Sequence, residues 1–213
     1  MRGVESPDGR IEFRIFVTQP REQSLTRPAY QVLYRGKILI DTSFLGLEIT
    51  DQEPILGENT GLTTSSSRAG ASYNSLTVEY LQNGSLGRRL NVEVRVSDNG
   101  IAFRYVIPFS TPLADLSIDD EDTEFALPHN PKAPLALPFV LEEPGAGWVE
   151  ITEVPEAKFP RVSLIQTDGS ALVTQLASRY QGKTPFTCPW RVILIGPDKD
   201  RLGQADLVRE LTR

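Results

Sequence analysis

The sequence predicts an all-β protein, a twisted two-sheet sandwich that forms one domain over residues 1–213. Three observations predict this fold. Stretches in which apolar and polar residues alternate recur along most of the chain, as in half-buried strands. Sixteen glycines and sixteen prolines punctuate these stretches, which is typical of β-sandwiches with short strands and many turns. Helical spacing of apolar residues is confined to residues 204–211.

The first third of the chain alternates clearly. A turn at Asp8-Gly9 precedes the first alternating stretch, and Arg35-Gly36 separates two further stretches, which predicts a hairpin. The strands expected here are residues 11–17, 29–34, 37–41 and 43–49. Residues 51–70 are polar and rich in glycine, serine and threonine, so we expect a loop and an irregular edge strand.

A meander follows, with the sharpest alternation in the sequence. Asn83-Gly84 and Asp98-Asn99-Gly100 are strong hairpin turns between three alternating stretches. The strands expected here are residues 73–80, 90–96 and 101–107.

The last half of the chain begins with an acidic stretch, residues 118–125, and a proline-rich one, residues 128–147. Because proline fixes φ and removes a donor, we expect the second stretch to be a long surface excursion with short extended pieces. Further strands are expected at residues 148–151, 162–166 and 171–176. Residues 184–191, with two prolines and a tryptophan, lead into the apolar residues 192–195, which predicts a buried closing strand.

Composition excludes several classes of function. The net charge is −6 and the pI about 5.0, and basic residues form no stripe, so nucleic acid is not an expected partner. No apolar run is long enough to cross a bilayer, so no membrane partner is expected either. The N-terminus lacks the apolar core of a signal peptide; a cytoplasmic location and a removed leader both remain open.

The ionisable residues limit metal chemistry. One cysteine, Cys188, excludes an internal disulfide, and one cysteine with one histidine cannot build a typical zinc site. Any metal would be a hard ion held by carboxylates.

An ordered set of short motifs resembles the N-terminal β-sandwich of glycoside hydrolase family 97 over essentially the whole chain. The motifs are Ser6-Pro7-Asp8-Gly9, Tyr30-x-Val32, Tyr34-x-Gly36-Lys37, Ser43-x-Leu45-Gly46-Leu47, Tyr73-Asn74-x-Leu76-Thr77-Val78, Asp98-Asn99-Gly100-Ile101-Ala102-Phe103-Arg104-Tyr105, Glu121-x-Thr123-Glu124-Phe125, Ile151-Thr152-Glu153 and Thr187-x-Pro189-Trp190-Arg191.

The resemblance implies a super-sandwich of the galactose-mutarotase-like type, followed in the whole enzyme by a catalytic (β/α)8 barrel that lies outside these 213 residues. It also implies hydrolysis of α-glucosides or α-galactosides by an enzyme that uses calcium, with the catalytic carboxylates on the barrel. One glutamate of the N-terminal domain reaches the calcium, and the matching residue here is Glu153. The sequence departs from the family pattern beside it, with Val154 for alanine and Lys158-Phe159 for Asp-Tyr.

Each candidate residue has a simpler alternative. Glu153 is a calcium ligand by resemblance, or an exposed glutamate at a strand end; one carboxylate cannot hold the ion alone. The acidic run 119–124 lacks the order of a calcium loop, so we expect a solvated charged face. Core packing is favoured over sugar stacking for Trp148 and Trp190. His129 is expected in an exposed loop, and Cys188 in the interior.

Nothing in the chain looks like a complete active site. The favoured function is therefore a non-catalytic accessory domain that packs on a catalytic barrel and shapes a site for an α-glycoside, with no cofactor bound by this chain alone. A free-standing β-sandwich that binds carbohydrate or protein is the alternative. An aldose-epimerase-like enzyme is disfavoured, because that chemistry needs histidines and the chain has one.

Overall fold

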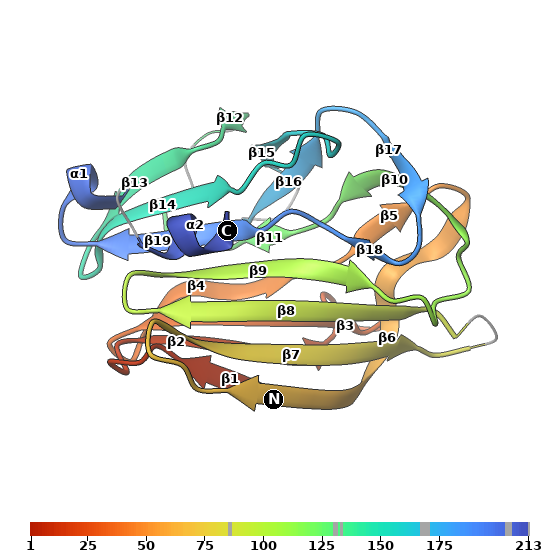
Figure 1. Ribbon diagram of the computed structural model, residues 1–213, viewed down its shortest axis with the longest axis horizontal. Helices are drawn as coiled ribbons and strands as arrows, with labels where there is room; N and C mark the ends of the chain where they lie inside the picture. The colour runs from red at the N-terminus through yellow and green to blue at the C-terminus, as the bar shows by residue number, and fades with distance from the viewer. Residues whose placement is uncertain (85–86, 130–131, 133, 167–170, 203–205, 213) are drawn as a thin grey trace.

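The computed structural model describes residues 1–84, 87–129, 132, 134–166, 171–202 and 206–212. The all-β sandwich predicted from the sequence is confirmed, and its strands are distributed over three hydrogen-bonded sheets (Figure 1).

The first sheet contains the four N-terminal strands in sequence order. Its elements are β1 (Arg2–Glu5), β2 (Ile11–Thr18), β3 (Arg27–Tyr34) and β4 (Lys37–Phe44). The alternation in β2 places Ile11, Phe13 and Ile15 fully inside. The predicted hairpin is present, because Arg35 and Gly36 both adopt a positive φ and bring Tyr34 opposite Lys37.

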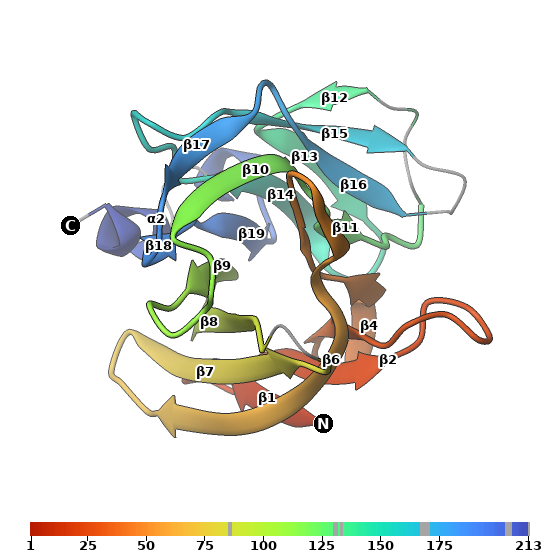
Figure 2. The same cartoon turned by 90° about the vertical axis from the view of Figure 1, so that its right-hand side faces the viewer.

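The second sheet contains eleven strands and bends strongly, so that it curls around the interior (Figure 2). Ten strands follow the order β13-β14-β19-β9-β8-β7-β6-β5-β10-β17, and β18 pairs with β9 beside β19. Their bounds are β5 (Leu47–Ile49), β6 (Gln52–Arg68), β7 (Tyr73–Gln82), β8 (Arg89–Ser97), β9 (Gly100–Ile107), β10 (Asp115–Glu121), β13 (Phe139–Glu143), β14 (Gly147–Glu153), β17 (Tyr180–Lys183), β18 (Phe186–Thr187) and β19 (Arg191–Gly196).

Residues 51–70 correct the sequence prediction. Most of this stretch is the 17-residue strand β6, so the irregular edge strand that was expected is longer, and the loop shorter, than predicted. Its first part pairs with β5, with Leu56 opposite Leu47, and its second part pairs with β7, from Thr60 to Arg68. Because most of β6 has a partner on one side only, polar side chains are tolerated along it, which explains why its sequence resembles a loop.

The third sheet is small, with the order β11-β16-β15-β12. Its strands are β11 (Glu124–Phe125), β12 (Leu135–Ala136), β15 (Val162–Gln166) and β16 (Leu172–Leu176). The proline-rich stretch therefore contains the short extended pieces that were expected, β12, β13 and the start of β14; residues 130, 131 and 133 lie outside the described part of the chain.

The main core lies between the first sheet and the curled second sheet. Aromatic rings from three strands meet there: the ring centroids of Phe13 and Tyr30 are 5.3 Å apart, and those of Tyr30 and Phe103 are 5.1 Å apart. These rings are fully buried, and such packing stabilises a core beyond the area it removes from water.

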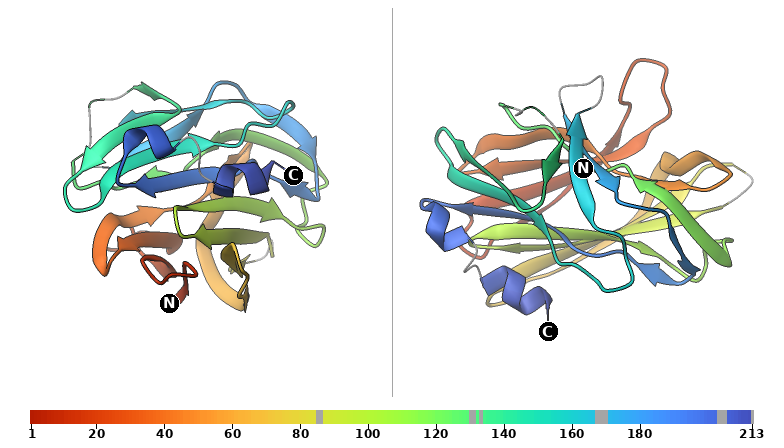
Figure 3. Two further views of the ribbon diagram at one scale, coloured as in Figure 1. Left: turned by 60° about the vertical axis from the view of Figure 1, so that its left-hand side comes forward. Right: turned by 90° about the horizontal axis from the view of Figure 1, so that it is seen from above.

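A second, smaller apolar cluster lies on the outer face of the large sheet. Two short helices, α1 (Lys199–Leu202) and α2 (Asp206–Leu211), lie near β19 on this side (Figure 3). Leu202 and Leu207 are buried there with Trp190, Val192 and Leu194. Of the predicted helical stretch 204–211, residues 204 and 205 lie outside the described residues.

No helix among the described residues combines the length and apolar character needed to traverse a bilayer.

Candidate functional site

The candidate site is a network of buried charges where β14 and β19 run side by side. Glu153 is the last residue of β14 and Arg191 the first of β19, and the antiparallel register places them directly opposite each other. Nη1 of Arg191 donates to Oε2 of Glu153 at 2.8 Å. Each side chain is 1% exposed, so Glu153 is not an exposed strand-end glutamate.

Glu121, the last residue of β10, completes the pairing of Arg191. Nε and Nη2 of Arg191 donate to the two carboxylate oxygens of Glu121 at 2.7 and 2.6 Å. The guanidinium group therefore forms a two-pronged pair with one glutamate while its third nitrogen holds the other. Such forked contacts fix direction as well as distance.

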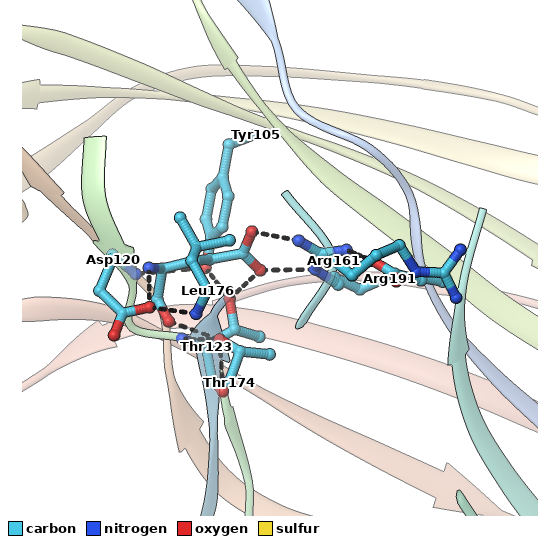
Figure 4. A network of polar contacts seen from close by, with 10 residues as sticks. Tyr105, Asp120, Thr123, Arg161, Thr174, Leu176 and Arg191 are labelled. Carbon is cyan, nitrogen blue, oxygen red and sulfur yellow. Dashed lines mark hydrogen bonds and ion pairs between the residues drawn. The ribbon is translucent and has the colours of Figure 1, made fainter. Parts of the chain in front are cut away.

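Hydroxyl groups hold Glu121 in place. Oγ1 of Thr123 donates to Oε1 of Glu121 at 2.9 Å and lies 2.7 Å from the hydroxyl of Tyr105. Thr174 donates to the backbone carbonyl of Glu121, and its oxygen accepts the amide of Thr123 at 3.1 Å. Asp120, the residue before Glu121, accepts a hydrogen bond from the backbone amide of Leu176 at 2.8 Å. Figure 4 displays this arrangement.

A second arginine faces the remaining oxygen of Glu153. Nε of Arg161 lies 2.6 Å from Oε1 of Glu153. The geometry is that of an ion pair only, since Oε1 is buried and has no hydrogen-bond partner among the described residues. Arg161 is 57% exposed while Glu153 is 1% exposed. Arg161 therefore closes the network from the solvent side.

The charges of the network balance. Glu121 and Glu153 contribute two negative charges, Arg191 and Arg161 two positive ones. Burial by itself would lower the pKa of Arg191, but the charge of Glu121, its hydrogen bonds and the charge of Glu153 raise this pKa above its ordinary value. Arg191 binds both Glu121 and Glu153. These two carboxylates are therefore not arranged like the two that flank a glycosidic bond during hydrolysis.

The residues here can offer a metal ion one oxygen. No group of three or more metal-binding side chains was found within the described residues. Oε2 of Glu153 accepts a hydrogen bond from Arg191, whereas Oε1 has no hydrogen bond from a described residue and lies beside the long, 57% exposed side chain of Arg161. A hard cation is compatible with Oε1 as a single ligand if Arg161 moves away and the other oxygens come from outside this chain.

The acidic run 119–124 divides into two groups of residues. Glu121 and Thr123 are fully buried, so the expectation of a solvated face is wrong at Glu121. Asp119, Asp120 and Asp122 are half-buried; Asp119 pairs with Arg179, and Asp122 with Arg27 at 2.9 Å. Asp119 and Asp122 therefore lie on a partly exposed, charged surface, in line with the expectation for these two residues.

The remaining candidates lie apart from the network. His129 is 76% exposed, as expected, with Nδ1 3.6 Å from Glu143. Cys188 is fully buried, and burial raises the pKa of its thiol well above the ordinary value, as suits an inert interior thiol. Trp148 is half-buried beside Lys199. Trp190 is 4% exposed, so the expected burial is confirmed, and it packs in the outer cluster, apart from the main core.

Sequence reasoning singled out Glu153 but missed its partners Glu121, Arg191 and Arg161. One signal was available: Glu121, Glu153 and Arg191 each belong to a different motif among those that carry the family resemblance, and the fold brings these three motifs together. Arg161 follows Pro160 in a stretch that departs from the family pattern, and nothing in the sequence marks it.

Comparisons with known proteins agree with this picture. The profile of the glycosyl-hydrolase 97 N-terminal family matches residues 4–136 and 132–213. No curated protein matches the chain in sequence.

Solved structures share the fold. A glycoside hydrolase family 97 enzyme from Pseudoalteromonas sp. strain K8 in complex with acarbose has a TM-score of 0.85 at 22% identity, over 100% of this chain and 38% of that one. A variant of that enzyme in complex with panose gives the same values. A β-arabinopyranosidase has a TM-score of 0.73 at 20% identity, over 92% of this chain and 40% of that one. With a family profile that covers nearly all of its length, this chain belongs to the glycosyl-hydrolase 97 N-terminal family.

Proposed function

We propose that this chain is the non-catalytic N-terminal domain of a glycoside hydrolase of the α-glucosidase or α-galactosidase type, which packs on a catalytic barrel and shapes one wall of its sugar site. Family membership supports the proposal, as does length, since the chain spans 38% of a family 97 enzyme that shares its fold. The observation that carries it is the buried network. Glu121 and Glu153 are both bound by Arg191, whereas glycoside hydrolysis needs two carboxylates on either side of the scissile bond.

The proposed substrate is an α-linked oligosaccharide. Acarbose and panose are bound by the Pseudoalteromonas enzyme and its variant. We extend this substrate class to the whole enzyme of which the present chain would be one part.

In that enzyme Glu153 is the proposed contribution of this chain to a calcium site. The free hydrogen-bonding capacity of Oε1 supports this role, and Arg191 would orient the carboxylate through Oε2. When bound, calcium would supply positive charge beside the sugar. The other ligands must come from outside the chain, because calcium takes six to eight oxygens.

Activity assays test the proposal directly. The chain alone is expected to leave nitrophenyl α-glucoside and α-galactoside intact, while a protein extended by the following coding sequence hydrolyses one of them. Turnover by the pure chain that is lost on mutating one of its own residues would contradict the proposal. A coding sequence that ends at Arg213 would favour the stand-alone binding module.

Calorimetry tests the calcium role. The chain alone is expected to bind calcium weakly or not at all, and the extended protein to bind it more tightly. In the extended protein, Glu153→Gln should weaken calcium binding, whereas Glu150→Gln on the opposite face of β14 should not. Low-micromolar binding by the chain alone, abolished by Glu153→Ala, would reveal further ligands within the chain.

A further inference from the structure

A groove of about 670 Å³ lies on the outer face of the large sheet, away from the Glu153 network. It lies over strands β6, β7, β8 and β9, beside Trp190, the residue before β19. The side chains that matter most among its lining are Arg68, Tyr73, Glu93, Arg95, Arg104 and Trp190. Its volume falls in the range of sites that hold small molecules.

The groove is positively charged although the chain carries a net charge of −6. Three arginines line it against one acidic residue, Glu93. Glu93 is already engaged, because Nε and Nη2 of Arg104 both lie 2.8 Å from its Oε2. Arg68 and Arg95 form no ion pair with any carboxylate in the described part of the chain. Two positive charges therefore remain unbalanced in the groove.

Arg95 is held in place without using its donors. Its guanidinium carbon lies 4.9 Å from the ring centroid of Tyr73 and 5.0 Å from that of Trp190. Aromatic contacts occupy the flat faces of a guanidinium group and leave its N–H edges free. Arg95 forms no side-chain hydrogen bond with another described residue, so the N–H donors of this half-buried guanidinium, which lines the groove, are available to a ligand.

Trp190 contacts the guanidinium groups of both Arg95 and Arg104. Trp190 is 4% exposed, and the guanidinium carbon of Arg104 lies 4.2 Å from its ring centroid. A ring so completely covered cannot stack on a sugar. Recognition in this groove would therefore depend on charge and hydrogen bonds, with hydroxyl groups supplied by residues such as Ser75 and Thr77.

We propose that the groove binds a small oxyanion, the carboxylate or phosphate of an acidic sugar, with Arg95 as its two-pronged anchor. A rigid guanidinium with free edges matches the two oxygens of such a group. Arg68 adds a second charge at the rim. Neither the family nor the barrel-packing function assigns a ligand to this face, and the proposal holds whether or not a barrel follows.

Nuclear magnetic resonance can test this because the chain has two tryptophans. The indole N–H signal of Trp190 can be assigned with Trp148→Phe and followed during titration with glucuronate, glucose 6-phosphate, inorganic phosphate and glucose at constant ionic strength. The signal should move saturably with the anions and stay in place with glucose. Tighter binding of glucuronate would identify a sugar acid as the ligand, and tighter binding of glucose 6-phosphate a sugar phosphate.

Two substitutions make the test specific. Arg95→Gln should weaken anion affinity by about tenfold or more, because hydrogen bonds to a charged group are the strong ones. Arg35→Gln is the matched control: Arg35 also stacks on a tyrosine, with its guanidinium carbon 5.1 Å from the Tyr34 ring, but it lies outside the groove and should leave affinity unchanged. If Arg95→Gln perturbs the fold, Arg95→Lys keeps the charge and should still weaken binding. A Trp190 signal that responds equally to sodium chloride, or anion affinity that survives both Arg95 substitutions in folded protein, would overturn the proposal.

Discussion

Arg191 illustrates how a single residue can decide whether a buried polar cluster is tolerated. A charge removed from water must be paired and hydrogen-bonded, or it costs several kcal/mol. Arg191 meets both requirements with two glutamates at 2.6–2.8 Å. The residue thereby joins strands β10, β14 and β19 at one point.

Removing this guanidinium group should be severe. Arg191→Ala leaves Glu121 and Glu153 buried without their main counter-ion, so we expect a loss of about 3–5 kcal/mol in the free energy of unfolding. Urea denaturation measures it. Arg14→Ala is the control, because the Arg14–Glu12 pair at 2.6 Å is about one-third exposed and solvent screening leaves such a surface pair with little effect on stability. Similar losses of unfolding free energy in both variants would show that burial of the Arg191 network is not the cause of the destabilisation.

Trp190 is the second residue whose substitution is informative. It lies in the outer cluster at 4% exposure, under Arg95 and Arg104. Trp190→Ala removes a buried ring, so we expect a destabilisation of about 3–5 kcal/mol, out of about 5–15 kcal/mol for a typical domain. A thermal melt decides, and near-coincident curves for variant and wild type would refute the buried packing role.

At the scale of elements, the sequence predicts strands well wherever one face of the strand is buried and the other is exposed to solvent. The meander β7–β8–β9 follows from alternation and from the Asp98-Asn99-Gly100 turn, and Ser97 lies opposite Gly100 as a tight turn requires. Strand β6 was predicted only in part, as an irregular edge strand beside a loop. Its two parts each pair on one side, with β5 and then with β7, so no apolar face is continuous along it.

The candidate site was less predictable for a related reason. Glu121 and Arg191 are 70 residues apart, and Glu153 and Arg191 are 38 apart. On a strand, an inward-facing glutamate has the same sequence signal as an outward-facing one, since only its partner reveals its burial. Resemblance to a family identified Glu153, but the identity of its partners depended on the pairing of β14 with β19.

The same pairing predicts a position that tolerates no side chain. A Cβ on Gly100 would lie 2.5 Å from the backbone oxygen of Ile193, where β9 meets β19. Gly100→Ala must separate these strands, so we expect a loss of about 1–3 kcal/mol, as for other overpacked sites. Gly61→Ala in β6 has nothing within 4 Å and is the control. Chemical denaturation that gives equal midpoints for the two variants would contradict the close approach.

At the scale of the whole molecule, the distribution of acidic groups shapes stability as much as their number. Burial raises the pKa of several carboxyl groups above their ordinary values. They are Glu48, Glu58, Asp120, Glu124 and Glu150. Backbone and side-chain hydrogen bonds lower the pKa of Asp41, and the pKa of Asp8 is lowered despite its partial burial. Among the carboxyl groups whose pKa is shifted, those that favour the protonated form in the folded state are therefore more numerous than those that favour the ionised form.

The sign of the resulting pH dependence follows from proton counting. Where the folded state holds more protons than the unfolded state, the free energy of unfolding falls as pH rises. For the raised carboxyl groups, this contribution is fully present below their ordinary pKa values of 3.8 and 4.5, and it is lost as pH rises through the folded values. We therefore expect a lower melting temperature at about pH 7 than at about pH 5.

Glu150 offers the cleanest test of this dependence, because burial is the only cause that raises its pKa. It points to the same face of β14 as Trp148, by alternation, and forms no ion pair with a described residue. Glu150→Gln removes a charge that the folded state disfavours, so the variant should be more stable at about pH 7, by about 1 kcal/mol or less because the group is only partly buried. Near pH 4 the variant and wild type should melt together. Glu142→Gln, an exposed neighbour on β13, should give a profile parallel to wild type. A constant offset between Glu150→Gln and wild type across this pH range would mean that the substitution acts through packing, and that burial of this carboxyl group does not contribute to the pH dependence.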